Sequence, residues 1–168
     1  MLWKQPSGSP SAIFGSFQLT ACPQPNPTTL TLNNNQSNNI IGLADQSGVT
    51  INGMSVNSAT GIITLNTSGL YLLNASFKVT QTSGAGGLTQ SHLFVTNPQN
   101  GFIFSVSEFI DEQTSGDTYR TLTLSGHAVI VATDNFQFRL RIYQGNYING
   151  IAIMGGNNRT GVSILKIS

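Results

Sequence analysis

Residues 61–80 carry the pattern that most limits the folds open to this chain. From position 70 onward apolar and polar side chains largely alternate, and a strand places successive side chains on opposite faces. One face would carry Tyr71, Leu73, Ala75, Phe77 and Val79. The other, wetter face would carry Leu72, Asn74, Ser76, Lys78 and Thr80. A period of two argues against a helix here and predicts a long strand with one side in a core.

The rest of the chain repeats short apolar runs between turn signals such as the pair Asn52 and Gly53. We predict strands at residues 13–22, 28–32, 40–43, 49–51, 62–65, 70–80, 88–96, 102–110, 119–131, 136–143, 148–154 and 161–167. Residues 33–39, 81–87 and 111–117 are predicted loops, and residues 55–60 a linking segment. No helical period and no repeat of fixed length is visible. Short strand candidates at this spacing predict an all-β antiparallel sandwich or barrel built from roughly ten of them.

Charge is scarce in this chain. Charged residues make up 8% of its 168 residues, whereas typical globular domains carry about a quarter. The formal net charge of +1 and the scattered basic residues argue against nucleic acid as a partner. Arg139 and Arg141 share one face of a predicted strand, and we interpret them as solubility and edge protection in preference to a ligand site. The surface must therefore be built from neutral Asn, Thr, Ser, Gln and Gly, which suits a protein packed among other proteins or one exposed to harsh or variable solvent.

The N-terminal region differs from the rest. Residues 1–12 hold Pro, Gly and Ser around Trp3, so we predict an arm that is flexible or bound to a partner, with Trp3 as a candidate anchor. Residues 13–168 form one predicted domain. The start of the chain lacks the apolar stretch of a signal peptide, and no apolar run is long enough to span a membrane. A single cysteine, Cys22, excludes an intrachain disulfide, so we expect synthesis in a reducing cytoplasm.

Three segments resemble, in order, the jelly-roll superfamily of tumour necrosis factor (TNF) and the globular heads of complement-type proteins. They are SGLYLLNASFKV, TLTLSGHAVIVATDNFQFRLRI and the closing RTGVSILKIS. The resemblance covers residues 13–168 and implies a ten-stranded antiparallel jelly roll that assembles into a homotrimer. Since the chain shows no signal segment or collagen-like stalk, it is most similar to the virus and bacteriophage surface branch of these trimers.

No catalytic set is visible, so we expect a protein that is not an enzyme and binds no cofactor. His92 and His127 are the only histidines, both lie within strand patterns, and no nucleotide or metalloprotease motif occurs. An acidic stretch offers oxygen ligands for calcium, although a solvated loop is the simpler interpretation. Its carboxylates are Glu108, Asp111, Glu112 and Asp117. An Asp near a threefold axis would also be triplicated and could hold a cation there.

The predicted fold, the family resemblance and the lack of a catalytic set suggest two functions. The first is a structural virion protein, a homotrimeric decoration, spike or vertex component that docks on a major capsid protein or another virion protein. It would reach the virion surface after synthesis in the host cytoplasm. The second is a trimeric head that binds a cell-surface glycan or receptor through its loops, with a bacterial or secreted TNF-like ligand as a further alternative. The loop binding candidates are Asp117, Tyr119, Tyr143 and Tyr147.

Overall fold

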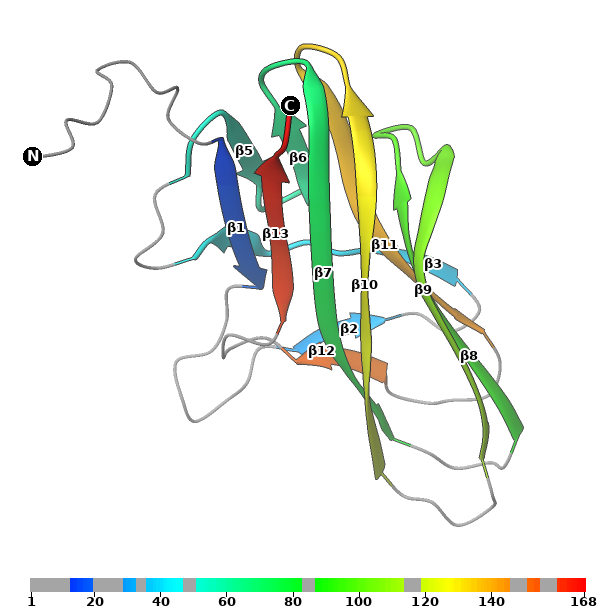
Figure 1. Cartoon of the computed structure of the whole chain (residues 1–168). Coiled ribbons are helices and arrows are strands. Elements are labelled where there is room, and N and C mark those ends of the chain that lie inside the picture. Colours follow the sequence, from blue (N-terminus) through cyan, green and yellow to red (C-terminus); the bar gives the residue numbers. More distant parts are fainter. Residues whose placement is uncertain are drawn as a thin grey trace, which may run out of the picture.

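The structure is a sandwich of two antiparallel β-sheets (Figure 1). This computed structural model describes residues 13–19, 29–32, 36–46, 51–82, 87–113, 119–145, 151–154 and 160–168. Within these ranges there are thirteen strands and no helix. The predicted all-β antiparallel sandwich is confirmed, with three more strands than the ten expected.

The first sheet is organised around the long strand that the sequence pattern indicated, β7 (Gly69–Thr82). β10 (Tyr119–Ala132) pairs with β7 along its whole length. β13 (Gly161–Lys166) and β12 (Ile151–Met154) share the other edge of β7. Three shorter strands complete the sheet: β1 (Phe14–Leu19) beside β13, β4 (Leu43–Asp45) beside β1, and β2 (Thr29–Leu32) beside β12.

The second sheet has β11 (Phe136–Gly145) in its interior. β8 (Gly87–Thr96) pairs with one edge of β11, and β9 (Phe102–Gln113) pairs with β8. The other edge of β11 is shared by β6 (Ile62–Leu65) and β3 (Gln36–Asn39), and β5 (Met54–Asn57) pairs with β6. Every strand pair in the described part of the chain is antiparallel.

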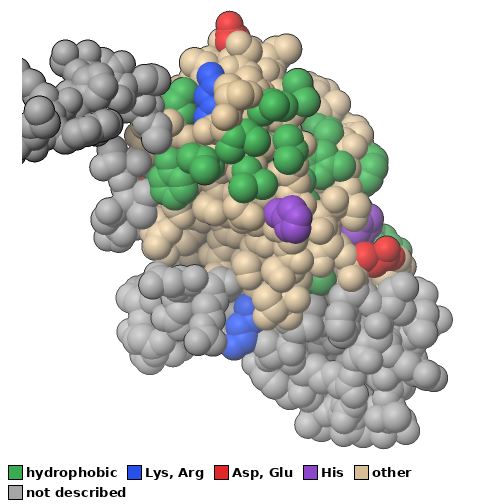
Figure 2. Space-filling view, viewed as in Figure 1, with side chains coloured by type: hydrophobic (Ala, Val, Ile, Leu, Met, Phe, Trp, Pro, Cys, Tyr) green, Lys and Arg blue, Asp and Glu red, His purple; other side chains and the backbone are tan. Residues whose placement is uncertain are grey.

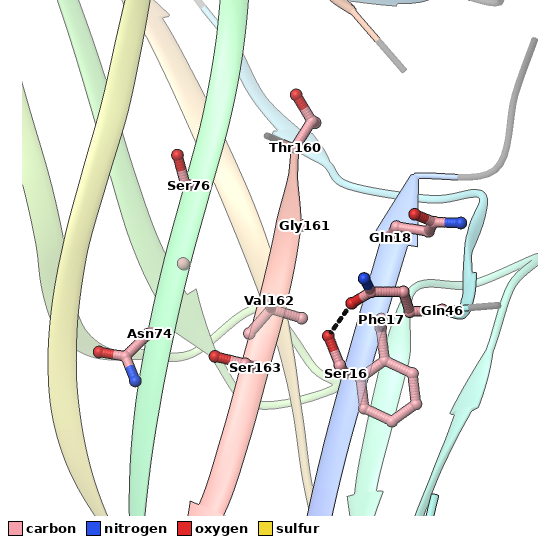
Figure 3. Close-up of a pocket in the computed structure, with 11 residues that line it drawn as sticks. Ser16, Phe17, Gln18, Gln46, Asn74, Ser76, Thr160, Gly161, Val162 and Ser163 are labelled. Atoms are coloured by element: carbon pink, nitrogen blue, oxygen red, sulfur yellow. Dashed lines mark hydrogen bonds between the residues drawn. The ribbon is translucent and has the colours of Figure 1, made fainter. Parts of the chain in front are cut away.

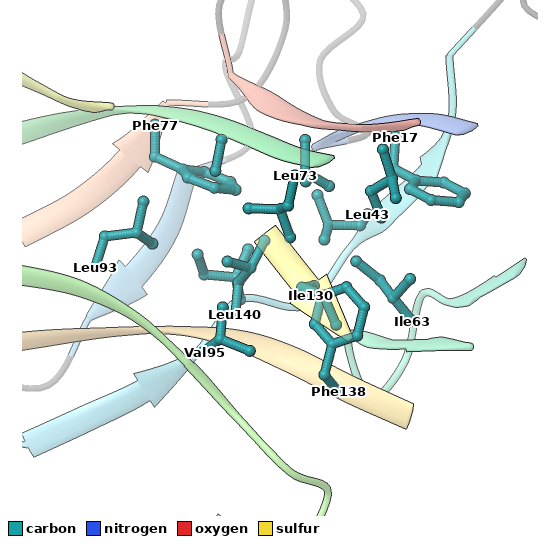
Figure 4. Packing of buried hydrophobic residues seen from close by; sticks show 14 of the residues in the cluster. Phe17, Leu43, Ile63, Leu73, Phe77, Leu93, Val95, Ile130, Phe138 and Leu140 are labelled. Carbon is teal, nitrogen blue, oxygen red and sulfur yellow. The ribbon is translucent and has the colours of Figure 1, made fainter. Parts of the chain in front are cut away.

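The core lies between the two sheets and is apolar (Figure 4). Phe17, Leu73 and Phe77 of the first sheet face Leu140 and Phe138 of the second. The inward phase of β7 is buried from Tyr71 to Val79, as its alternation predicted. A fully buried Leu or Phe is worth about 1.5–3 kcal/mol relative to its exposed state, so this cluster is the main source of stability.

Two turns at one end of the sandwich are tied together. The backbone N–H of Ser68, before β7, donates a hydrogen bond of 2.6 Å to Oδ1 of Asp134, in the turn between β10 and β11. The hydroxyl of Tyr71 donates to the carbonyl oxygen of Thr67 at 2.7 Å. Asn135 supplies the left-handed backbone of its turn, with φ of 57°. These bonds fix where β7, β10 and β11 begin or end, and so set their register.

Several boundaries differ from the sequence prediction. β3 lies in the predicted loop at 33–39, because the edge of β11 offers backbone partners to a polar segment of low strand propensity. β5 lies in the segment predicted as a link, and residues 40–42 and 51 are not in strands. β9 continues to Gln113, so the predicted acidic loop begins later than expected. β10 is continuous through Gly126, where a side chain would overlap the carbonyl oxygen of Val106.

Candidate interaction surface

The outer face of the first sheet carries large apolar side chains where water would be expected. β7 and β10 each place one apolar residue in each of two neighbouring rows across the sheet, and the rows are completed by Leu165 of β13 and by Ile167, directly after β13. The six residues, called the apolar patch below, are Leu70, Leu72, Val129, Val131, Leu165 and Ile167. Figure 2 shows hydrophobic side chains gathered over these strands.

The patch is accessible in the single chain. Val131 is 77% exposed, Val129 55% and Ile167 52%, while Leu70 and Leu165 are each more than a third exposed. A contiguous exposed apolar surface of this kind marks an interaction site in soluble proteins, because its burial against a partner releases ordered water. The patch can therefore bind another apolar surface.

A neutral polar groove continues the same face beyond the patch. Gly161 of β13 pairs with Gln18 of β1 on one side and Ser76 of β7 on the other, and these residues line a cavity of about 220 Å³ (Figure 3). The hydroxyl of Ser16 donates to Oε1 of Gln46 at 2.5 Å in the wall of this groove. Such groups can form hydrogen bonds to a partner without the desolvation cost of buried charges.

Charge is absent from the central part of this face. Below the apolar patch, the next two cross-strand rows contain Ser, Asn, Gln, Gly and His, and no Asp, Glu, Lys or Arg occurs in them among the described residues. His127 belongs to the first of these rows and is exposed. The central part of this face is therefore suited to protein contact and, among the described residues, offers no charged ligand-binding group.

Of the site residues predicted from sequence, the structure describes the side chain of Tyr143 alone. Trp3, Asp117 and Tyr147 lie outside the described residues. Tyr119 begins β10, and its side chain is also outside the description. Tyr143 is half-buried on β11, in the second sheet, opposite Ser37 of β3 and His92 of β8.

The described part of the predicted acidic stretch lies on β9, and Asp117 is outside the described residues. Glu108 lies on β9, where Oε1 accepts a hydrogen bond of 2.7 Å from the side chain of Gln90. Asp111 and Glu112 are in the same strand, but their side chains are outside the description. In the described ranges no three His, Cys, Asp or Glu side chains lie together as metal ligands.

The apolar patch was missed because alternation alone assigns its residues to the wet side of each strand. Leu72, for example, was placed with Asn74 and Lys78 on the polar face of β7. The sequence did contain one sign of the patch: large aliphatic residues occupy positions of three separate segments where alternation would put polar side chains. Pairing those strands in the observed register is what brings the residues into one surface.

A solved structure described as "Structure of Eiger TNF from S. frugiperda" is similar to the whole sandwich. The match covers 94% of this chain and 93% of that chain, with a TM-score of 0.59 and 10% sequence identity. The chain has a TNF-like jelly-roll fold. The sequence matches no protein-family model and no curated protein. At 10% identity this structural similarity establishes the fold alone.

Among the residues that the structure describes, no helix is long and apolar enough to cross a membrane.

Proposed function

We propose that the protein is a non-enzymatic structural component that assembles as a homotrimer through the outer face of its first sheet. The observation that carries the proposal is the apolar patch on β7, β10 and β13, which is exposed in the single chain. Copies arranged in a closed ring would cover this surface in every subunit, whereas open association would leave it exposed at the ends. The TNF-like fold supports a ring of three, since the sequence resemblance implies such trimers.

The place of this trimer is, in our proposal, the surface of a virion. Two features support this role over a soluble signalling role. Charged residues are only 8% of the chain, and neutral polar groups build most of its polar surface, as suits a protein packed beside other proteins. The docking partner would be a major capsid protein or another virion protein, with the N-terminal arm and Trp3 as the candidate contact.

A trimeric receptor-binding head or ligand is the second candidate. The observation in its favour is the TNF-like likeness itself, because the similar structure is named as a TNF and the match spans nearly the whole of both chains. Both candidates require the same trimer, so they separate only in what the trimer contacts.

The mass of the purified protein in solution tests the assembly. Light scattering at micromolar concentration should give three times the 17.9 kDa mass of one chain. A monomer under these conditions would contradict the homotrimer. Antibodies raised against the trimer should then label intact particles from the cells that produce it. Labelling of cell surfaces in place of particles would favour the receptor-binding candidate.

A further inference from the structure

The outer face of the second sheet contains buried polar atoms that lack partners. Nε of Arg139, Nε of Arg141, Oδ1 of Asn39 and Oγ1 of Thr96 are buried and make no hydrogen bond to any described residue. The register brings these four residues together, because Arg141 pairs with Asn39 of β3 and Arg139 pairs with Thr96 of β8. No other buried side-chain nitrogen or oxygen in the described ranges is unpaired.

The two guanidinium groups are held in place from one side. Nη2 of Arg141 donates to the carbonyl oxygen of Ser37 at 2.6 Å, and Nη2 of Arg139 donates to the carbonyl oxygen of Pro98. The guanidinium carbon of Arg141 lies 6.0 Å from the ring centroid of Phe94. These contacts position the groups through backbone oxygens and an aromatic face, and none of them supplies a negative charge.

Neither arginine forms an ion pair with a carboxylate among the described residues. Burial, and then the positive charge of Arg139, lower the pKa of Arg141. Two adjacent, partly desolvated positive charges are unfavourable without a compensating anion. Buried polar groups are paired in the great majority of proteins, so four orphaned atoms in one place indicate a missing partner.

The position of the arginines excludes their simplest explanation. Edge protection requires an edge strand, but β11 is an interior strand with β8 on one side and β6 and β3 on the other. Solubility requires a solvated side chain, whereas both residues are only partly exposed and their Nε atoms are buried. The interpretation of Arg139 and Arg141 as edge protection is therefore wrong.

We propose that this outer face of β11 binds an acidic sugar, with Arg139 and Arg141 holding its carboxylate. Arginine N–H groups match the planar geometry of a carboxylate and form strong charge-assisted hydrogen bonds with it. The fully buried Thr96 and the half-buried Asn39 flank the two guanidinium groups from the neighbouring strands. Phe102, which is 63% exposed and packs beside Phe94 with ring centroids 6.1 Å apart, offers an apolar surface to a sugar ring.

This inference does not depend on the homotrimer, because the arginines and the apolar patch lie on different sheets of the sandwich. Failure of the protein to form trimers would leave it intact, and absence of the site would leave the trimer intact.

The test is a titration observed at the Nε–H groups of the arginines by ¹⁵N–¹H NMR, at constant ionic strength. The probes are glucuronic acid and N-acetylneuraminic acid, with glucose as the neutral control and acetate as the carboxylate control. We expect saturable shifts of the Arg139 and Arg141 signals with at least one of the two acids. Because hydrogen bonds to charged groups contribute about 1.5–3 kcal/mol, glucose should bind roughly tenfold to a hundredfold more weakly. The response to either acid identifies which kind of acidic sugar fits.

Variants locate the binding. Arg139→Gln and Arg141→Gln should each weaken the acid by roughly tenfold or more, and Arg141→Lys should also weaken it, because lysine keeps the charge but loses the fork of donors. Lys78→Gln removes one positive charge from the other sheet and should leave the affinity unchanged. Shifts no larger than those with chloride, acetate binding as tightly as both acids, or equal weakening by Lys78→Gln would each overturn the proposal. The wild-type titration decides even where a variant fails to fold.

Discussion

Gly61 occupies a position that no other residue can adopt without strain. Its φ is +70°, and an added Cβ would overlap the backbone carbonyl oxygen of Ile40. A left-handed backbone alone costs a non-glycine residue roughly 1–2 kcal/mol. Gly61→Ala should therefore lower the free energy of unfolding by more than this amount. Gly42→Ala is the matched control, because Gly42 has φ of +78° but its Cβ would meet Leu19 only at an ordinary 3.6 Å. Urea unfolding of both variants measures the difference, and equal losses would contradict the steric explanation.

The Tyr71 hydroxyl is a second residue with a defined task, since it donates to the carbonyl oxygen of Thr67 at the start of β7. Tyr71→Phe should cost about 1 kcal/mol of unfolding free energy, the usual net contribution of such a bond. Tyr143→Phe serves as control, because the Tyr143 hydroxyl has no partner among the described side chains and backbone groups. Thermal unfolding should separate the two variants, and an equal effect would count against the role assigned to Tyr71.

At the scale of the element, β7 shows how alternation becomes stability. Leu73 is fully buried between the sheets, whereas Asn74, the next residue, is exposed. Leu73→Ala should cost about 2–5 kcal/mol, because it removes apolar contacts and leaves a cavity. Asn74→Ala should change the unfolding free energy by less than about 0.5 kcal/mol. Chemical denaturation is the measurement, and comparable losses would mean that the faces of β7 are assigned the wrong way round.

β9 shows where the same pattern fails. Simple alternation would place Phe102, Phe104 and Val106 on one face, and the structure departs from this at Phe102, whereas Phe104 and Val106 both pack against the core. Two irregularities in the pairing with β8 leave Val106 and Ile103 without a partner residue. Phe102 is consequently exposed, while Phe104 packs against the core. A bulge depends on the partner strand and on close neighbours such as Gly126 of β10, so no local pattern in β9 could have revealed it.

The existence and type of the long strands were predictable, because β7, β8, β10 and β11 have strong periodic patterns of their own. The short strands β3 and β5 were not, since their pairing is decided by an edge that another strand offers. The candidate sites were less predictable still. Arg139 and Arg141 were visible as a pair on one face, but their unpaired Nε atoms become apparent only with Asn39 and Thr96 beside them.

For the whole molecule, the two outer faces of the sandwich differ in chemistry. The first sheet presents an apolar patch beside a neutral polar groove, and the second presents two half-buried arginines on β11. A homotrimer that covers the first face would leave the second available to a ligand. Three copies of the arginine pair would then bind a multivalent surface far more tightly than one copy.

Assembly through the apolar patch makes a prediction that separates association from folding. Val129 and Val131 are 55% and 77% exposed in the single chain, so the double variant Val129→Asp, Val131→Asp should fold normally. In the assembled ring the new carboxylates would be buried without partners, at several kcal/mol each, which weakens association roughly a thousandfold or more. Light scattering should then give the mass of one chain, with an unchanged circular dichroism spectrum. Gln137→Asp, on the exposed face of the second sheet, should remain trimeric. A double variant that stays trimeric would show that the copies meet through another surface.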